Sequence, residues 1–186
     1  MESARLLIRP MEAADKNEFV NGIKDRALRT AYGFPVGMDD GVAVQIFHHF
    51  CALDRSYSLV EKRSGKMIGF LLTVSPELPD EVRNALPEKG RTLAYAVFPP
   101  FQRQGYMLEA LQAVISELFG TGTVGYIHCG HFEENVPGRE LLRKLGCQAY
   151  ASHKAGNRLI IDEILICATG KRTGKQRRHI AETGSI

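Results

Sequence analysis

The segment from residue 98 to residue 111 carries the residues whose types and spacing suggest chemistry most directly. Pro99 and Pro100 stop a strand-like run, and a short loop containing Gly105 leads straight into an amphipathic helix. Such a loop aims free backbone N–H groups and the positive end of the helix dipole at one point, which suits a pyrophosphate. Glycine lets the backbone approach the anion without a Cβ atom, and Arg103 can add charged donors.

Backbone groups on either side of Gly105 complete this predicted anion site. The amides of Gln102 and Gln104 can join it, and Met107 in the first turn of the helix offers its own N–H group. Because these contacts come from the backbone, they depend little on side-chain identity.

Strand-like and helical patterns alternate around the loop. Strands are expected at residues 6–8, 58–60, 67–74, 93–97 and 124–132, with a final hairpin over 148–167. Helices are expected from Asp15 as N-cap through Leu28, at residues 42–53 and 107–119, and from Asn135 as N-cap to Gly146. Residues 30–40 and 76–90 are expected to be loops because glycine and proline recur there.

Length and composition place the chain among folded soluble proteins. It has 186 residues, 44% hydrophobic and 24% charged, which predicts one ordinary domain. The four cysteines stand far apart without a C-x-x-C pair, which favours free thiols in a reducing compartment. The sequence shows neither an export signal nor an apolar run long enough to span a bilayer, so we expect a cytoplasmic protein without membrane contact.

Positive charge is concentrated at the C-terminus. Five of the 24 Lys and Arg residues lie between residues 171 and 178, and without them the body is close to neutral. We therefore predict a domain over residues 1–170 and a basic, flexible tail over 171–186. A neutral body argues against a nucleic-acid platform, although the tail keeps open an alternative as an RNA- or ribosome-associated protein.

The loop and its surroundings resemble the GNAT superfamily of N-acetyltransferases, whose pyrophosphate loop reads Gln/Arg-x-x-Gly-x-Gly/Ala. Gln102, Gly105 and Tyr106 match, and the continuation Glu109-Ala110-Leu111 is typical of the branch that acetylates the N-termini of ribosomal proteins. Residues 5–10, 135–146 and 161–162 are similar to that branch's opening strand, its Asn-x-x-Ser…Leu-Gly helix and its final strand.

The resemblance implies an α/β (α+β) GNAT fold with a central mixed, mostly antiparallel twisted sheet, splayed at the cofactor-binding strand and flanked by helices. It also implies acetyl-CoA as cosubstrate. The implied cofactor-binding residues lie on a strand end, on the loop and at the cap of a later helix: Val97, Phe98, Gln102, Arg103, Gln104, Gly105, Tyr106, Met107 and Asn135.

Two positions depart from the family pattern. Met107 stands where the loop expects a small residue, and Gly138 stands where the family has a serine three residues after Asn135. The backbone N–H of Met107 survives the first change, whereas the second removes a hydroxyl. A non-catalytic acyl-CoA-binding module is therefore the alternative to an enzyme.

Candidate catalytic groups come from the end of the strand over residues 124–132 and from the cofactor strand. His128, His131, Glu133 and Glu134 lie near the expected acceptor site, and the ordinary pKa of histidine suits a general base. We predict His131 as the base, with Glu133 nearby and with Tyr95 contacting the acceptor or the thioester. We expect no metal, because neighbouring residues on a strand point to opposite faces.

The predicted activity is transfer of the acetyl group of acetyl-CoA to a primary amine. The branch resemblance leans towards a protein N-terminal α-amine, and a small-molecule amine stays open. Members of this family often form dimers, so a homodimer also stays open.

Overall fold

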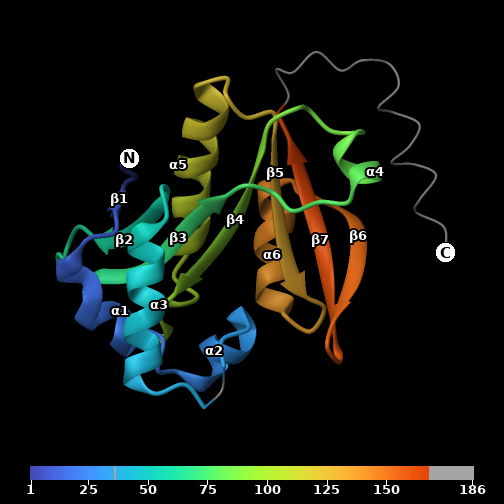
Figure 1. The fold of residues 1–186 in the computed structure, drawn as a ribbon. Helices are drawn as coiled ribbons and strands as arrows, with labels where there is room; N and C mark the ends of the chain where they lie inside the picture. Colours follow the sequence, from blue (N-terminus) through green and yellow to red (C-terminus); the bar gives the residue numbers. More distant parts are fainter. Residues whose placement is uncertain (36, 168–186) are drawn as a thin grey trace. The chain divides into compact units, whose positions relative to one another are not determined.

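The computed structural model describes residues 1–35 and 37–167, which form two compact units (Figure 1). The first unit contains residues 1–73 and 94–114, and the second contains residues 74–93 and, among the described residues, 115–167. The predicted tail over residues 171–186 and its boundary at residue 170 lie outside the described residues. Across the described ranges, every helix is too short or too polar to cross a membrane.

A seven-stranded sheet runs through the chain in the order β1-β2-β3-β4-β5-β7-β6. β4 (Gly90–Val97) and β5 (Tyr126–Phe132) pair in parallel, whereas the β1–β2, β2–β3, β5–β7 and β6–β7 pairs are antiparallel. The predicted mixed, mostly antiparallel sheet is confirmed. The parallel register covers Gly90–Thr92 against Tyr126–His128. The predicted splay of β4 from its neighbour stays a prediction.

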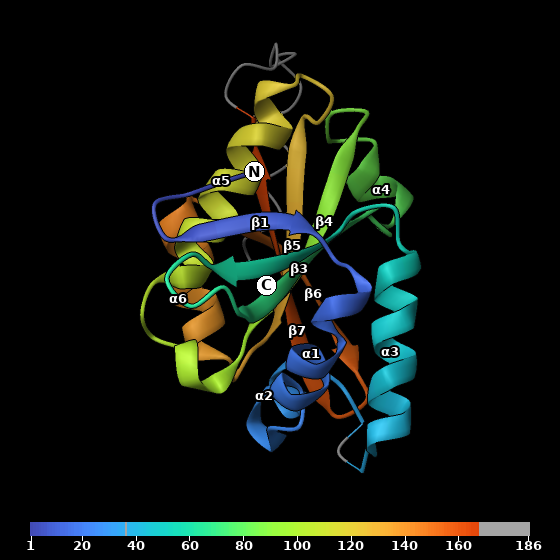
Figure 2. The same cartoon turned by 90° about the vertical axis from the view of Figure 1, so that its left-hand side faces the viewer.

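The first unit holds three strands and three helices that precede the cofactor loop. The strands are β1 (Leu6–Pro10), β2 (Ser56–Glu61) and β3 (Met67–Val74). The helices are α1 (Lys16–Gly22), α2 (Arg26–Tyr32) and α3 (Asp40–Ala52), with a 3-10 turn, η1 (Ala13–Asp15), before them. Helices α1 and α3 lie side by side (Figure 2). The loop is followed by α5 (Tyr106–Gly120), which continues into the second unit.

Phenylalanine side chains form the centre of the first unit. The Phe19 ring of α1 lies 5.4 Å from the Phe47 ring of α3 and 5.4 Å from the Phe70 ring of β3, measured between ring centroids. All three side chains are fully buried. Burying a side chain of this size contributes about 1.5–3 kcal/mol, so these contacts join the two helices firmly to the sheet.

The helix predicted from Asp15 to Leu28 is wrong in its length, whereas Asp15 does stand at the N-cap position of α1. It is two helices, and its break lies between Gly22 and Arg26, where Asp25 caps α2 by accepting from the Leu28 N–H at 2.8 Å. The carboxylate of Asp15 does not cap α1, because it instead accepts hydrogen bonds from other groups: Arg9, Ser58 and the backbone of Glu12.

The two predicted loops are each partly helical. The first one, residues 30–40, begins inside α2, which continues to Tyr32 and ends at Gly33 with a left-handed φ of 82°. The second, residues 76–90, contains the short helix α4 (Asp80–Arg83). Four residues are too few to display helical periodicity, so the pattern could not reveal α4.

The second unit pairs β5 with β7 (Arg158–Ile166), and β7 with β6 (Gln148–Ala155) at the edge of the sheet. Helix α6 (Val136–Leu145) contacts β5 (Figure 1). Asn135 caps α6 by accepting from the Gly138 N–H at 3.1 Å, and Gly146 ends it with a φ of 83°. The cap and the end of this helix are confirmed as predicted.

Candidate functional site

The loop between β4 and α5 turns through two residues with left-handed backbone conformation. After the 3-10 turn η2 (Pro99–Phe101), Arg103 has a φ of 59° and Gly105 a φ of 81°. A side chain in this conformation costs about 1–2 kcal/mol, which glycine avoids. A Cβ atom added at Gly105 would meet only the Arg5 guanidinium, at 3.5 Å, so glycine is needed here for its backbone conformation.

The start of α5 presents unpaired backbone donors to solvent. The first intrahelical bond runs from the Glu109 N–H to the Gly105 carbonyl at 3.1 Å. The N–H groups of Tyr106, Met107 and Leu108 precede it and therefore point out of the helix end. The loop residues before them are exposed. Donors and helix dipole together suit this end to an anion, and the donors include the backbone N–H of Met107.

An ion pair that the sequence did not reveal fixes this loop to the residues directly before β1. The Glu109 carboxylate accepts three hydrogen bonds, from Ser3 Oγ at 2.6 Å and from Arg5 N and Nε at 2.7 Å each. Arg5 Nη1 also donates to the Gln104 carbonyl at 2.9 Å. Burial opposes ionisation, but these bonds outweigh it and hold the pKa of Glu109 below its ordinary value. We call Ser3, Arg5, Gln104 and Glu109 the loop clamp.

Tyr106 completes the attachment of the loop to the strands. Its hydroxyl donates to Glu61 of β2, and the Arg5 guanidinium lies over its ring, 4.2 Å from the centroid. The hydrogen bond to Glu61 raises the pKa of the Tyr106 hydroxyl. The Tyr106 side chain is therefore structural, and a role towards a cofactor falls to its backbone N–H.

The end of β4 divides its backbone groups between two edges. The Phe98 N–H donates to the Ile68 carbonyl of β3 at 2.8 Å. Successive residues of a strand direct their N–H groups to opposite edges, so the Val97 groups face away from β3. The Val97 carbonyl accepts from Gln102 Nε2 at 2.9 Å. Of the two residues predicted to hold a pantetheine arm, Val97 is the one whose N–H faces away from its neighbouring strand.

Phe98 has a packing role as well. Its ring contacts the backbone of Gly22 so closely that a Cβ atom added there would lie 2.3 Å from the ring. The aromatic side chain thus anchors the strand end on α1. Tyr95, also on β4, is half-buried in the same unit. Its predicted contact with acceptor or thioester stays a prediction.

His131 is buried between two oxygen atoms in the second unit. Its Nδ1 donates to the Phe132 carbonyl at 3.0 Å, and its Nε2 lies 2.9 Å from Glu163 Oε1. A carbonyl can only accept, so Nδ1 carries a proton, and the proton of the second contact is held either by Nε2 or by Glu163. Neither arrangement leaves a lone pair for an amine. The predicted role of His131 as base stays a prediction.

His128 has a different set of partners. Its Nδ1 lies 2.9 Å from Thr92 Oγ1 and its Nε2 lies 3.1 Å from Asp162 Oδ1. The second oxygen of Asp162 lies 2.7 Å from His153 Nδ1. His128 and His131 therefore face different carboxylates from the same strand. Within the described residues, no group of three or more His, Cys, Asp or Glu side chains is arranged to hold a metal ion.

The turn from β5 into α6 contains the remaining predicted residues. Glu133 is exposed, and its backbone N–H donates to the Leu159 carbonyl at 2.9 Å. A Cβ atom added at Gly138 would lie 2.7 Å from Asn135 Nδ2. The Asn135 cap thus occupies the space that the family's serine would need. The predicted contact of Asn135 with a pantetheine amide stays a prediction.

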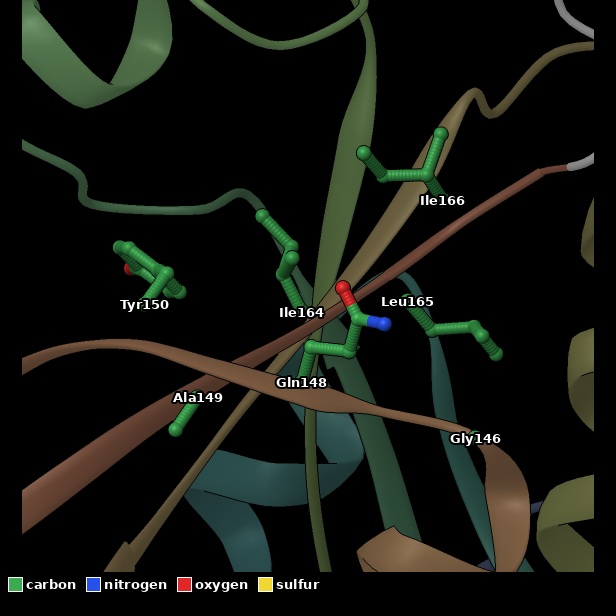
Figure 3. Close-up of a pocket in the computed structure, with 7 residues that line it drawn as sticks. All are labelled: Gly146, Gln148, Ala149, Tyr150, Ile164, Leu165 and Ile166. Atoms are coloured by element: carbon green, nitrogen blue, oxygen red, sulfur yellow. The ribbon is translucent and has the colours of Figure 1, made fainter. Parts of the chain in front are cut away.

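The structure gathers the predicted residues in two groups. Those of the cofactor loop and strand end lie in the first unit, whereas His131, Glu133 and Asn135 lie in the second. A small pocket elsewhere in the second unit contains none of them (Figure 3). It is lined by residues around the start of β6 and the end of β7: Gly146, Gln148, Ala149, Tyr150, Ile164, Leu165 and Ile166.

The mixed sheet and the exposed anion loop at the start of α5 are the features of an acyltransferase fold. Residues 5–148 match the family model described as the Acetyltransferase (GNAT) domain. The chain therefore belongs to the GNAT acetyltransferase family and is an acyltransferase, and this family uses acetyl-CoA as cosubstrate. No curated protein matches the chain.

Solved structures of low sequence identity share this fold. A GNAT-family acetyltransferase from Bacillus anthracis is 15% identical, with a TM-score of 0.76 over 89% of this chain and 97% of that one. The ribosomal-protein-S5-alanine acetyltransferase from Vibrio fischeri is 16% identical, with a TM-score of 0.69 over 91% and 97%. An acetyltransferase from Salmonella typhimurium that modifies the N-terminal serine of ribosomal protein L7/L12 is 17% identical, with a TM-score of 0.68 over 88% and 96%.

Proposed function

We propose that this protein transfers the acetyl group of acetyl-CoA to a primary amine, and that the amine is a protein N-terminal α-amine. The observation that carries the proposal is the exposed, clamped loop at the start of α5, in a chain of the GNAT family. Two enzymes whose structures share this fold acetylate ribosomal proteins, and one of them acts on an N-terminal serine. These activities support an α-amine as the acceptor.

The loop fits the pyrophosphate of coenzyme A by its donor chemistry. Three N–H groups at the helix end, from Tyr106, Met107 and Leu108, provide donors where the helix dipole is positive. Arg103 adds a positive charge on the exposed loop, and the Arg5 guanidinium lies beside Gly105. No acidic side chain is part of residues 102–108, so the phosphates meet no repulsion from the loop itself.

Individual groups are proposed to meet the other requirements of acetyl transfer. The thioester provides an activated acetyl group, and an aligned N–H donor stabilises negative charge that develops on its oxygen. The Val97 N–H is our candidate for this donor. Asn135 keeps Nδ2 as a donor while its oxygen caps α6, which is consistent with its proposed contact to the pantetheine arm.

Calorimetric titration of acetyl-CoA and of CoA tests the binding half of the proposal. Adenosine 3′,5′-bisphosphate serves as the control ligand because it lacks the pyrophosphate and the pantetheine arm. We expect saturable one-to-one binding of acetyl-CoA and CoA and much weaker binding of the control. Absence of acetyl-CoA binding would refute the proposed function.

A matched pair of variants tests whether the loop at Gly105 binds the phosphates of acetyl-CoA. Gly105→Glu introduces a carboxylate where the phosphates are proposed to bind, and we expect about 100-fold weaker acetyl-CoA binding, close to 2.7 kcal/mol. Gly122→Glu adds the same charge at another left-handed glycine, with a φ of 67° and open space around it. Equal affinity of the two variants would contradict the loop assignment.

An amine screen tests the acceptor. Peptides that begin with serine, alanine or methionine are compared with spermidine and an aminoglycoside, and products are identified by mass spectrometry. We expect peptide α-amines to be acetylated with the highest kcat/KM. Acetylation confined to the small molecules would refute the α-amine assignment and support a small-molecule acceptor.

A further inference from the structure

Part of the Arg5 guanidinium is bound inside the protein, and part of it is available to a ligand. Nε donates to the Glu109 carboxylate at 2.7 Å, and Nη1 donates to the Gln104 carbonyl at 2.9 Å. The Tyr106 ring lies against the face of the group, with 4.2 Å from Arg5 Cζ to the ring centroid. Among the described residues, Nη2 has no hydrogen-bond partner. Both N–H groups of Nη2 can therefore donate to a ligand.

The three contacts hold the guanidinium in one orientation, although the Arg5 side chain is 44% exposed. An arginine at the surface normally loses side-chain entropy when it binds a ligand, because its rotamers must be ordered. Here the Glu109 carboxylate, the Gln104 carbonyl and the Tyr106 ring have already ordered it. A preorganised arginine binds an anion more tightly than a mobile one of the same charge.

Nη2 of Arg5 lies directly beside the glycine of the cofactor loop. The position that a Cβ atom on Gly105 would take is 3.5 Å from Nη2, and no other described atom outside residues 104–106 lies within 4 Å of that position. The N–H groups of Tyr106, Met107 and Leu108 follow Gly105 at the start of α5. All of these residues belong to the first unit. Arg5 therefore adds a charged donor beside the backbone donors that are proposed to bind the pyrophosphate.

Positive charge exceeds negative charge around this part of the loop. The carboxylates that interact with Arg5 belong to Glu61 and Glu109. Arg63 also interacts with Glu61, and Arg103 lies on the loop itself. Three arginines thus stand against two glutamates, which leaves a net positive charge for a phosphate.

We propose that Arg5 is a direct ligand of the cosubstrate, with Nη2 donating to the pyrophosphate of coenzyme A. The inference rests on the proposed function. The guanidinium fork matches the geometry of phosphate oxygens, and hydrogen bonds between charged groups are about twice as strong as neutral ones. The loop clamp therefore has two roles, because it holds the loop in place and presents a charged donor to the ligand. Glu109 is a positioning residue, since it acts through Arg5.

Substitutions of Arg5 and Glu109 separate these two roles. Glu109→Gln loosens the clamp but keeps Nη2, whereas Arg5→Gln removes both. We expect calorimetric titration to show about fivefold weaker CoA binding for Glu109→Gln and about 50-fold weaker binding for Arg5→Gln. Adding Arg5→Gln to Glu109→Gln should therefore still weaken binding about tenfold. No further loss in the double variant would overturn the proposal, because Arg5 would then act through the clamp alone.

Arg5→Lys tests the guanidinium rather than the charge. The ammonium group is a compact point charge that cannot hold Glu109 and reach the ligand at the same time. We expect CoA binding about tenfold weaker than that of the wild-type protein. Wild-type affinity in Arg5→Lys would overturn the role of Nη2. Arg26→Gln, which removes an exposed arginine of α2 in the same unit, is the matched control and should keep the wild-type Kd.

A second ligand distinguishes the phosphates of coenzyme A. 3′-Dephospho-CoA keeps the pyrophosphate and lacks the phosphate on the ribose. We expect Arg5→Gln to weaken the binding of CoA and of 3′-dephospho-CoA by the same factor. A loss confined to CoA would overturn the pyrophosphate assignment and move the contact to the ribose phosphate.

Thermal unfolding without ligand shows whether the losses of affinity come from the fold. We expect Arg5→Gln and Glu109→Gln to have similar Tm values, since each breaks the same ion pair. If Arg5→Gln bound CoA as tightly as the wild-type protein, the role of Arg5 would fail and the proposed function would stand. If the wild-type protein bound neither CoA nor acetyl-CoA, the proposed function itself would fail.

Discussion

Removal of the negative charge from the loop clamp should weaken both the fold and cosubstrate binding. In Glu109→Gln, the new amide oxygen can still accept from Ser3 Oγ and from Arg5 N, but the amide nitrogen faces Arg5 Nε, which is also a donor. Hydrogen bonds to charged groups contribute about 1.5–3 kcal/mol. Because the Arg5 side chain is 44% exposed, screening reduces this, and we expect a loss of about 1 kcal/mol.

Thermal unfolding and calorimetry measure this effect separately. A loss of about 1 kcal/mol lowers the Tm of a chain of this size by about 2–4 °C. If binding must re-order the loosened loop, the same free energy weakens the Kd for acetyl-CoA about fivefold. Glu140→Gln is the matched control, since its ion pair with Arg143 is exposed on α6, and we expect no measurable change in either quantity.

The difference in stability between the wild-type protein and Glu109→Gln should also depend on pH. Because the pKa of Glu109 lies below its ordinary value of 4.5, the folded protein binds fewer protons than the unfolded chain near that pH. The stabilisation is therefore fully present when the pH lies above the pKa of Glu109 in the unfolded chain. It is lost as the pH falls through the pKa of Glu109 in the folded protein. Wild type and Glu109→Gln should converge in stability in acid. A Tm and a Kd for Glu109→Gln equal to the wild-type values at pH 7 would refute the clamp.

Three further substitutions address packing and pairing. Gly90→Ala places a Cβ atom 2.1 Å from the Tyr126 ring, so urea unfolding should show about 2–3 kcal/mol of destabilisation, and a wild-type midpoint would contradict this packing. Gly138→Ser restores the family's hydroxyl but displaces Asn135, so we expect about 1 kcal/mol lower stability and no gain in kcat. A gain in kcat would contradict the conclusion that the Asn135 cap leaves no space for this serine. His131→Gln breaks a buried pair with Glu163, and we expect about 3 kcal/mol of destabilisation in urea. Loss of the acidic limb of the pH profile in this variant would support His131 as base.

Features encoded by a few neighbouring residues were predictable from the sequence. Asn135 and Gly146 mark the ends of α6 because a capping amide and a left-handed glycine act within one turn of the helix. The strand, loop and helix around Gly105 were predicted for the same reason, and its positive φ agrees. Such signals need no knowledge of distant contacts.

Features that depend on distant contacts could not be predicted in this way. The apolar spacing of Phe19, Ile23 and Leu28 suits one helix, but the chain breaks beside Gly22, where the Phe98 ring packs on its backbone. The two histidines of β5 look equivalent in sequence, and only the structure shows that one of them contacts Asp162 and the other Glu163. Periodicity carries no information on either contact.

The loop clamp also constrains the order in which the protein matures during synthesis. Arg5 and Glu109 are separated by 104 positions in the chain, so the ion pair cannot form until the ribosome has released the first turn of α5. Until then the preceding segment is held to the N-terminal residues by the bond from Arg5 to the Gln104 carbonyl, without the ion pair. Acetyl-CoA binding by nascent chains of increasing length should therefore appear late, and chains that end before Glu109 should not benefit from added cosubstrate as a folding aid.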